Sequence, residues 1–314
     1  DDFLETEEAP DGSLILRERP NSADRLAELE KQVDRKQPAE ESPVPLLEVK
    51  GLRVHFTSGG GFLGKPRETV KAVDGVDLSI PKGKTLGLVG ESGCGKTTIG
   101  RAILLLVPPT SGSVRYDGAN LASLNPDAML AYRKRMQIIF QDPYASLNPR
   151  LTIEQALTEP LAVHRIGSGA SERRDRVVSL LEEVGLSSEH LLRYPHEFSG
   201  GQRQRLCVAR ALAVEPEFIV CDECVSAMDV SVQAQVLNLL RELQERRNLT
   251  YLFISHDLSV VKFVSDHVAV MHAGRIVETA PAEELYRNPK EIYTQELLDA
   301  VPKADLETLR KRSV

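Results

Sequence analysis

The sequence lacks any long run of apolar residues. Its longest unbroken aliphatic stretch covers Ala102 to Val107 and ends at Pro108, far short of the roughly 20 apolar residues that cross a bilayer as a helix. We expect no secretory leader. Cysteine is scarce, with four residues in 314, which is too few for a disulfide framework and favours a reducing compartment. We therefore expect a cytoplasmic protein without a membrane span.

An excess of basic charge is also absent. The formal net charge is -7, but thirteen of the 46 acidic and six of the 39 basic residues lie in residues 1–45, which leaves 33 of each for the remainder. The body of the protein is therefore neutral, and no basic stripe crosses it. Such a body has no electrostatic basis for binding DNA or RNA, so we expect no nucleic-acid partner.

The first 45 residues are poor in large apolar side chains and end in a proline-rich stretch, which predicts an acidic flexible linker or tail. Within it, residues 22–37 can form a charged helix with Leu26, Leu29 and Val33 on one stripe. This helix could be solvated or docked, and three apolar residues favour the solvated form. The chain begins at Asp1 rather than Met, so we expect a fragment or processed product that could follow another domain.

From Leu47 onward the pattern becomes that of a folded domain, and 41% of the whole chain is hydrophobic. Apolar and polar residues alternate over 52–56 and 76–80, which predicts half-buried antiparallel strands. An apolar strand over 85–89 then enters a glycine-rich turn and a helix over 97–106. This order indicates the start of a parallel α/β unit.

The rest of the domain is expected to continue this mixed pattern. Residues 128–198 are rich in helix formers and predict a helical subdomain. A later helix over 232–246 has one apolar face, formed by Val236, Leu239, Leu240 and Leu243 at helical spacing. Short strands are predicted over 218–221, 251–254, 268–271 and 275–278.

A phosphate-binding loop is the strongest chemical motif. The stretch Gly90-Glu91-Ser92-Gly93-Cys94-Gly95-Lys96-Thr97-Thr98 fits G-x-x-x-x-G-K-[ST] between a strand and a helix. Glycines let backbone N–H groups wrap a phosphate chain, the lysine reaches the β- and γ-phosphates, and the threonine hydroxyl after it can bind Mg²⁺. All nine residues are therefore predicted to bind a nucleoside triphosphate.

A second acidic motif ends the apolar strand over 218–221. Asp222 is predicted to hold Mg²⁺ and the neighbouring Glu223 to act as the base that orients the attacking water. Cys221 and Cys224 have the spacing of a C-x-x-C pair, but no second ligand pair lies at a spacing suited to zinc. We interpret Cys221 as a small core residue.

A third motif, His196-Glu-Phe-Ser-Gly-Gly-Gln-Arg-Gln-Arg205, precedes a helix. Ser199, Gly200 and Gly201 can form a second anion-binding helix start. The alternative is an ordinary helix cap with a solvated, arginine-rich surface. One chain would then contain two helix starts that can bind phosphate, and the presence of both needs an explanation.

Together these motifs resemble those of the ATP-binding cassette (ABC) ATPases, in order and spacing over residues 47–280. The matching elements are the phosphate loop, Gln141 in Ile-Ile-Phe-Gln-Asp-Pro, the signature Phe198-Ser-Gly-Gly-Gln202, Asp222-Glu223, Asp229 in Ser-Ala-Met-Asp, and His256 in Ile-Ser-His-Asp. The resemblance implies an α/β fold: a P-loop NTPase ABC cassette with a RecA-like parallel-sheet core, an antiparallel β subdomain and a helical signature subdomain. The ATPase domain would cover 46–280, with the helical subdomain at about 128–198.

Three further segments, 142–149, 229–235 and 288–302, resemble the oligopeptide/dipeptide permease ATP-binding subunits, and residues 281–314 would be the C-terminal extension of that type. The resemblance implies a Mg²⁺-dependent ATPase that powers a membrane importer for peptides. Its partners would be transmembrane permease subunits, a second identical or homologous ATPase subunit and, indirectly, an extracytoplasmic solute-binding protein. It would lie peripherally on the cytoplasmic face of the inner membrane.

The resemblance also implies roles for individual residues. Two cassettes would pair head to tail, so that Ser199, Gly200, Gly201 and Gln202 of one act on ATP held by the other, and Asp229 contacts the opposite subunit. Glu223, His256, Gln141 and Lys96 would be the catalytic residues, and Thr97, Gln141 and Asp222 would hold Mg²⁺. Phe56 would either stack on adenine or belong to the core. Phe198, Cys224 and Met228 depart from the family pattern but are all apolar, so we expect catalysis to be retained.

The alternative functions are those of a soluble remodelling cassette and of a catalytically silent regulatory cassette. A soluble cassette that remodels a macromolecular complex would favour a basic or coiled-coil insertion, which residues 128–198 lack. A catalytically silent cassette is disfavoured by Glu223 and His256.

We also expect Tyr144 and Leu147, which have no periodic partner, to line a surface groove that receives a helix of the membrane subunit; the alternative is a turn tucked against its own subdomain.

Overall fold

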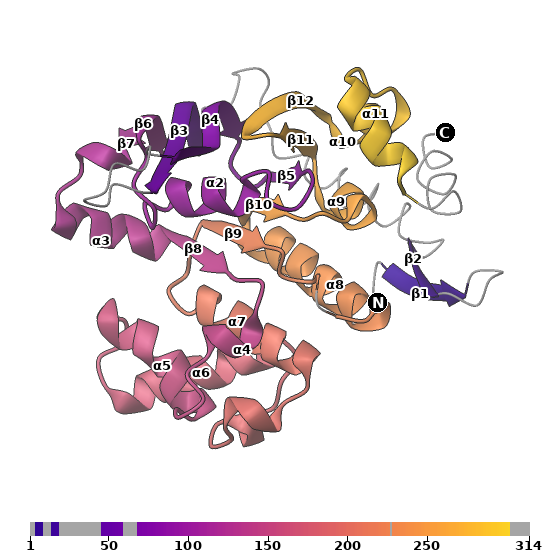
Figure 1. The fold of residues 1–314 in the computed structure, drawn as a ribbon. Helices are drawn as coiled ribbons and strands as arrows, with labels where there is room; N and C mark the ends of the chain where they lie inside the picture. The colour runs from indigo at the N-terminus through magenta and orange to yellow at the C-terminus, as the bar shows by residue number, and fades with distance from the viewer. Residues whose placement is uncertain (1–3, 9–13, 19–44, 59–67, 227, 302–314) are drawn as a thin grey trace, which may run out of the picture.

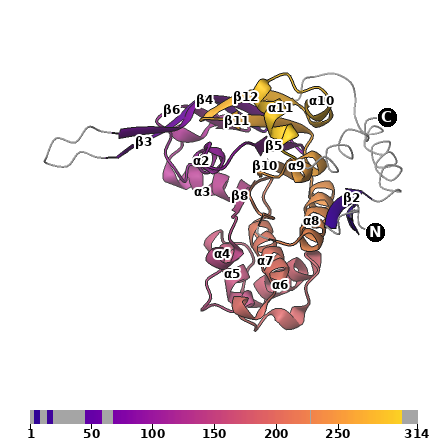
Figure 2. The ribbon, with the colours of Figure 1, turned by 45° about the vertical axis from the view of Figure 1, so that its right-hand side comes forward.

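The computed structural model describes residues 4–8, 14–18, 45–58, 68–226 and 228–301. In Figures 1 and 2, the upper lobe holds the two large sheets and the lower lobe consists of helices. The strand β9 (Phe218–Asp222) and the helix α8 (Val230–Arg247) lie between the lobes. The lobes therefore meet at the edge of the central sheet.

The central sheet has six strands in the order β12-β11-β5-β10-β9-β8. All neighbours are parallel except β12, which runs antiparallel to β11. Every residue of β5, β9 and β10 is buried, as is typical of parallel strands covered on both faces. The predicted α/β fold class is confirmed. The other strands of this sheet are β5 (Thr85–Val89), β8 (Met136–Ile139), β10 (Thr250–Ile254), β11 (His267–His272) and β12 (Arg275–Pro281).

A second, antiparallel sheet has the strand order β4-β3-β6-β7. Its strands are β3 (Leu47–Ser58), β4 (Glu68–Ile80), β6 (Ser111–Tyr116) and β7 (Ala119–Asn120). Leu52 and Val54 point inward while Arg53 is exposed, as the alternation predicts. Their inner face shares one core with Leu88 of the central sheet and with Ile99 of the helix α2 (Lys96–Ile103). The phosphate-loop helix is thus clamped between two sheets.

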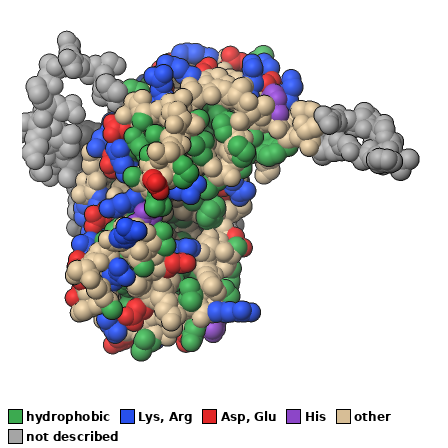
Figure 3. Space-filling view, turned by 90° about the vertical axis from the view of Figure 1, so that its left-hand side faces the viewer, with side chains coloured by type: hydrophobic (Ala, Val, Ile, Leu, Met, Phe, Trp, Pro, Cys, Tyr) green, Lys and Arg blue, Asp and Glu red, His purple; other side chains and the backbone are tan. Residues whose placement is uncertain are grey.

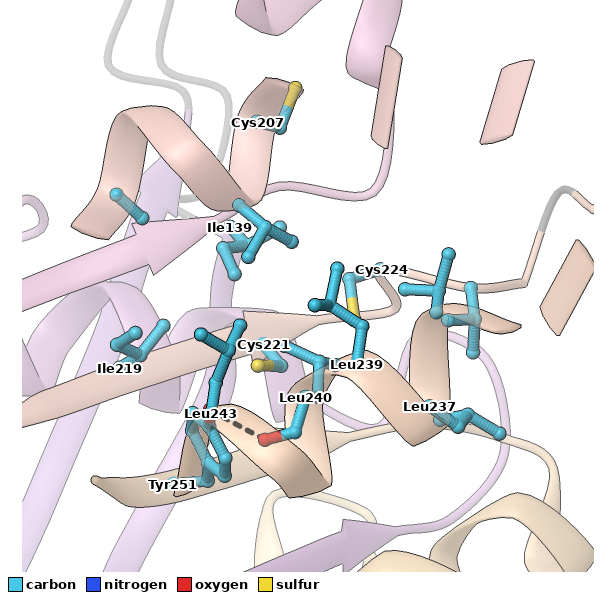
Figure 4. Close-up of a cluster of buried hydrophobic side chains, with 14 of the residues drawn as sticks. Ile139, Cys207, Ile219, Cys221, Cys224, Leu237, Leu239, Leu240, Leu243 and Tyr251 are labelled. Atoms are coloured by element: carbon cyan, nitrogen blue, oxygen red, sulfur yellow. Dashed lines mark hydrogen bonds between the residues drawn. The ribbon is translucent and has the colours of Figure 1, made fainter. Parts of the chain in front are cut away.

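A second core joins the other face of the central sheet to the helices. Figure 4 shows part of it, where Cys221 and Cys224 lie among aliphatic side chains and the Tyr251 hydroxyl donates to the Leu240 carbonyl at 3.0 Å. The remaining helices are α3 (Pro126–Arg135), α4 (Pro143–Ser146), α5 (Ile153–Val163), α6 (Ala170–Glu183), α7 (Gly200–Leu212), α9 (Leu258–Val264), α10 (Ala282–Arg287) and α11 (Ile292–Asp299). Short 3₁₀ turns cover Leu121–Ser123, Ser188–His190 and Pro195–Glu197.

The sequence predicts a helical subdomain over residues 128–198, but in the structure this stretch is not wholly helical. It is interrupted by β8, whose Met136 pairs with Phe218 of β9 and whose four residues form the edge of the central sheet. A strand of four residues is too short to display a period of its own, and tertiary pairing decides its conformation. The helices of the lower lobe therefore begin after β8, and α7 belongs with them.

The N-terminal segment contains two strands that the sequence does not predict. β1 (Leu4–Glu8) and β2 (Leu14–Glu18) pair antiparallel and lie beside α8. The charged helix expected over 22–37 lies outside the described residues. Among the residues that the structure describes, no helix has the length and apolar character needed to cross a bilayer.

Candidate functional site

The phosphate loop connects the end of β5 to the start of α2. Gly90, Gly93 and Gly95 have φ angles of 150°, 83° and 111°, which side chains rarely adopt. A Cβ on Gly90 would lie 2.1 Å from the Met271 carbonyl oxygen, and one on Gly95 would lie 2.1 Å from that of Ala72. A Cβ on Gly93 would meet nothing within 4 Å. The loop therefore packs its two ends against neighbouring backbone and leaves its middle open.

Lys96 places a buried positive charge in this loop. It is 4% exposed, and its Nζ donates to the carbonyl oxygens of Gly90 at 2.7 Å and Glu91 at 2.9 Å. These carbonyl partners are neutral, and a buried charge is stabilised further by an opposite charge. Beside it lies a hollow lined by Ser92, Gly93, Thr97, Thr98 and Glu223, among others. This arrangement suits an anion that enters from the open side.

The next two predicted ligands are in direct contact. The Thr97 hydroxyl donates to Oδ1 of Asp222 at 2.8 Å, and Asp222 is only 3% exposed. Burial raises the pKa of the Asp222 carboxyl, against the Thr97 hydrogen bond that lowers it. A hydroxyl and a carboxylate oxygen are ligands that Mg²⁺ prefers, so the residues present fit this ion.

Within the described part of the chain, no three His, Cys, Asp or Glu side chains form a group that could hold a metal ion. A Mg²⁺ beside Thr97 and Asp222 would therefore complete its shell with phosphate oxygens and water, as this ion commonly does in nucleotide sites.

Three predicted catalytic residues follow neighbouring parallel strands. Gln141 follows β8, Glu223 follows β9 and His256 follows β10, and the carboxyl ends of parallel strands meet at one edge of the sheet. The structure brings them together: Oε2 of Glu223 accepts from Nε2 of Gln141 at 2.9 Å and lies 3.5 Å from Nδ1 of His256. Glu223 also lines the hollow beside the phosphate loop.

The backbone of Glu223 is unusual. Its φ is 49°, in the left-handed region, and its N–H donates to the carbonyl of Ile254 at 3.0 Å. A non-glycine residue in this conformation is strained unless its surroundings hold it there. The anchor on β10 therefore fixes the carboxylate at the end of β9, next to Asp222.

The signature residues form a second glycine-rich helix start. Ser199 caps α7, accepting from the Gln202 N–H at 3.3 Å, while Gln202 Oε1 accepts from the Ser199 N–H at 3.1 Å. A Cβ on Gly200 would meet nothing within 4 Å, whereas one on Gly201 would lie 2.4 Å from the Val232 side chain. None of these four residues lines the hollow at the phosphate loop, and α7 lies in the lower lobe whereas α2 lies in the upper.

Two further predicted binding residues lie outside the phosphate-loop hollow. Asp229 caps α8, and its Oδ1 accepts from the Ser231 hydroxyl at 2.8 Å and the Val232 N–H at 3.0 Å; these hydrogen bonds hold the pKa of Asp229 below its ordinary value. Phe56, near the end of β3, is 46% exposed. It is therefore not a core residue, and the alternative of core packing is wrong.

The expectation for Tyr144 and Leu147 is wrong for one of the pair. Leu147 is 2% exposed and packs in the core shared by the helices, because the chain turns inward after the single turn of α4. Tyr144 is 62% exposed, and the guanidinium of Arg203 lies over its ring at 3.6 Å from the centroid.

A hollow does lie close to this segment, between β8 and the helical lobe. It is lined by residues that include Ile138, Phe140, Ser146, Pro160 and Arg210. Figure 3 shows the side of the molecule on which α3 and α5 lie, where hydrophobic side chains gather in the upper half. Neither Tyr144 nor Leu147 lines this hollow, so it is not the groove predicted from the sequence.

The cysteine pair lies inside the core. Cys221 and Cys224 are 0% and 1% exposed. The hydrogen bond with Cys224 and burial together raise the pKa of the Cys221 thiol well above its ordinary value. A protonated, buried thiol is neither a ready metal ligand nor a redox nucleophile, which agrees with the interpretation of Cys221 as a core residue.

Sequence reasoning misses one residue at the phosphate loop. The hydroxyl of Tyr293, on α11, accepts a hydrogen bond from the Glu91 N–H at 3.3 Å. The two residues are 202 positions apart, so no local spacing could connect them.

The family model described as "ABC transporter" matches residues 73–226. The oligopeptide transport ATP-binding protein OppF of Bacillus subtilis is 54% identical over 85% of this chain and 86% of its own length. OppF of Streptococcus mutans is 50% identical over 85% of both chains. A putative peptide import ATP-binding protein of Brucella ovis is 51% identical over 86% of this chain and 83% of its own.

Two solved structures with similar folds are of the ATP-binding cassette MJ0796. A dimeric post-hydrolysis state bound to ADP and Pi has a TM-score of 0.66 and 28% identity, covering 75% of this chain and 98% of the other. A second dimeric structure of the same cassette has a TM-score of 0.65 with the same identity and coverage.

Proposed function

Because this chain belongs to the family of ABC transporter ATP-binding proteins, we propose that it is the ATPase subunit that powers an importer of oligopeptides or dipeptides. The peptide branch is supported by its relatives, which are 50–54% identical and carry oligopeptide transport or peptide import names. The observation that carries the catalytic part is the convergence of Gln141, Glu223 and His256 beside the phosphate loop.

The residues of the phosphate loop would bind the triphosphate of ATP. Lys96 already presents its ammonium at the hollow, and it would neutralise phosphate oxygens while keeping the loop carbonyls as neighbours. Thr97, Asp222 and Gln141 would hold Mg²⁺, which when bound supplies positive charge against the transferred phosphoryl group. Phe56, exposed near the end of β3, is available to stack on adenine.

Glu223 would act as the general base. Its carboxylate accepts the proton of the water whose oxygen attacks the γ-phosphorus, and ADP leaves with the bridging oxygen. Gln141 and His256 contact the same carboxylate oxygen, at 2.9 and 3.5 Å. They therefore orient the base, and His256, which is itself exposed, can reach the γ-phosphate.

The signature residues would act on a nucleotide held by a second cassette subunit, identical or homologous. In support, Ser199 and Gly200 are exposed at the first turn of α7, and the described residues leave space around Gly200. Backbone N–H groups at a helix start bind phosphate well. Asp229, exposed at the start of α8, would face the same subunit.

Transmembrane permease subunits would supply the pore, and a solute-binding protein would deliver the peptide to them. We infer that a short helix of the permease fills the hollow lined by Phe140, Pro160 and Arg210, because Phe140 immediately precedes Gln141 in the chain and the lining offers apolar contact next to a cation. The protein would therefore lie peripherally on the cytoplasmic face of the inner membrane. The contacts of Gln141 and His256 with the Glu223 carboxylate argue against a catalytically silent cassette.

Reconstitution tests this function. The chain is assembled with its permease subunits and a second cassette in proteoliposomes, and uptake of a labelled oligopeptide is measured with the peptide-loaded binding protein. ATP-dependent uptake is expected with the wild-type chain and not with Glu223→Gln. ATP hydrolysis without uptake of any oligopeptide or dipeptide tested would contradict the peptide assignment and leave the ATPase assignment standing.

A further inference from the structure

The C-terminal extension touches the nucleotide site through one side chain. Tyr293 is the second residue of α11, and its hydroxyl accepts a hydrogen bond from the N–H of Glu91, the second residue of the phosphate loop. The ring of Tyr293 lies against His272 at the end of β11, with the ring centroids 4.0 Å apart. The hydroxyl is thus held toward the loop by the ring's own packing.

The start of α11 is itself anchored to the central sheet. Glu278 of β12 is 8% exposed, and its two carboxylate oxygens accept from the N–H groups of Lys290 at 2.9 Å and Glu291 at 3.1 Å. Burial works to raise the pKa of Glu278, but the hydrogen bonds to its carboxylate outweigh it and lower that pKa below its ordinary value. A charged acceptor makes these bonds stronger than neutral ones. The position of Tyr293 is therefore set by β12 and not by α11 alone.

The contact acts on a peptide that Lys96 also uses. In the peptide group between Gly90 and Glu91, the Gly90 carbonyl accepts from Lys96 Nζ at 2.7 Å, while the Glu91 N–H donates to Tyr293. On the far side of the loop, the Cys94 carbonyl accepts from the Gly274 N–H at 3.0 Å. Tyr293 thus braces the first half of the loop, as the turn between β11 and β12 braces the second half.

Loss of the hydroxyl would change position more than stability. Glu91 is exposed, so water can replace Tyr293 as the acceptor of its N–H without leaving a buried group unpaired. The loop would then sample other orientations of the Gly90–Glu91 peptide, and binding would have to restore the one whose carbonyl accepts from Lys96. The apparent Kd for the ligand then rises in inverse proportion to the fraction of time that the loop is correctly placed.

We propose that Tyr293 is a positioning residue that holds the phosphate loop ready for the triphosphate and ties the C-terminal extension to ATP binding. The proposal rests on the proposed function, because it takes ATP as the ligand of the loop.

The test compares two Tyr→Phe variants of the full chain. Tyr293→Phe keeps the ring against His272 and removes only the acceptor. The control is Tyr286→Phe, since Tyr286 is fully buried on α10 and its hydroxyl donates to the Leu258 carbonyl, away from the phosphate loop. The equilibrium Kd for ATP is measured with Mg²⁺ by calorimetry, and the melting temperature is measured without nucleotide.

Tyr293→Phe is expected to weaken ATP binding about fivefold, the effect of one modest hydrogen bond, with no change in melting temperature. Tyr286→Phe is expected to lower the melting temperature, because a buried carbonyl loses its donor, and to leave the Kd unchanged. In steady-state ATPase assays of the assembled complex, Tyr293→Phe should raise KM by a similar factor while kcat stays within about twofold.

Three results separate the possible failures. If the wild-type chain does not bind ATP, the proposed function fails and this inference with it. If the wild type binds but Tyr293→Phe binds equally well or more tightly, only the inference is overturned. If Tyr293→Phe lowers melting temperature and affinity together, the residue is merely structural and the inference is again overturned.

Discussion

The two glycine-rich helix starts of this chain differ in what surrounds them. At the start of α2, a buried lysine, the Thr97–Asp222 pair and the Glu223 carboxylate all converge on one hollow. At the start of α7, Ser199 and Gly200 are exposed, and Ser199 is engaged with Gln202 in its own helix cap. We therefore propose that similar backbone chemistry serves a site that this chain nearly completes in one case, and a surface that a second cassette completes in the other.

The glycines themselves make the same distinction. Cβ atoms on Gly90 and Gly95 would strike backbone carbonyls of the same chain, so the fold itself excludes larger residues there. A Cβ on Gly200 would strike nothing. A substitution at Gly200 can therefore test function without disturbing the fold, whereas a substitution at Gly90 would disturb both.

The largest effect is expected at the completed site. Glu223→Gln keeps the shape of the side chain but removes the proton acceptor, so turnover by the assembled complex should fall by about 10²- to 10⁴-fold. ATP binding should remain, because the phosphate contacts are intact. ATPase assay and calorimetry check both halves, with the exposed Glu189→Gln as the matched control. Turnover within a few-fold of the wild type would rule out this assignment of the base.

The exposed helix start gives the next largest effect. Gly200→Glu adds a carboxylate at the first residue of α7, where there is room and where the helix dipole favours negative charge, so the melting temperature should not fall. Turnover of the assembled complex should drop at least about 100-fold, because the carboxylate would repel a γ-phosphate. Gly201→Ala is the contrast, since its Cβ would press on Val232 and lower the melting temperature. Wild-type turnover by Gly200→Glu would remove the signature from the catalytic account.

Lys96→Ala removes the buried charge of the completed site. Charge-assisted hydrogen bonds contribute roughly 1.5–3 kcal/mol, so the Kd for ATP should rise about 10- to 100-fold at constant Mg²⁺. Calorimetry on the isolated chain measures this directly. An unchanged dissociation constant would mean that the nucleotide binds elsewhere.

The smallest effect is expected at Glu278, whose carboxylate anchors the start of α11 behind the phosphate loop. Folding lowers the pKa of Glu278 below its ordinary value of 4.5. The ionised carboxylate therefore stabilises the native state at pH values above 4.5. This stabilisation is lost as the pH falls through the lower pKa of the folded state. Glu278→Gln should therefore cost about 1 kcal/mol of unfolding free energy at pH 7, and the difference from wild type should shrink below about pH 4.5. Denaturant titrations at several pH values measure it. A constant difference down to pH 3 would contradict this account.

The sequence predicts the residues of the phosphate-loop site far better than the strands and packing contacts that surround it. Residues 90–98 and Asp222-Glu223 are contiguous motifs whose chemistry is local, and the strands that carry them are apolar enough to be recognised. The four residues of β8 are too few for a period, and their strand pairing depends on β9. The burial of Leu147 depends on how the lower lobe folds back over α4, and the Tyr293 contact joins segments 202 residues apart. Such features follow from tertiary packing, which no short window of sequence contains.

In the proposed mechanism, the two helix starts serve different nucleotides. Equilibrium binding of ATP with Mg²⁺ to the isolated chain tests this most directly, without any need to identify the partner subunit. We predict that Gly200→Glu binds ATP with the wild-type Kd, whereas Lys96→Ala binds about 10- to 100-fold more weakly. A loss of affinity in Gly200→Glu as large as that in Lys96→Ala would mean that both helix starts grip one nucleotide, and would contradict the account.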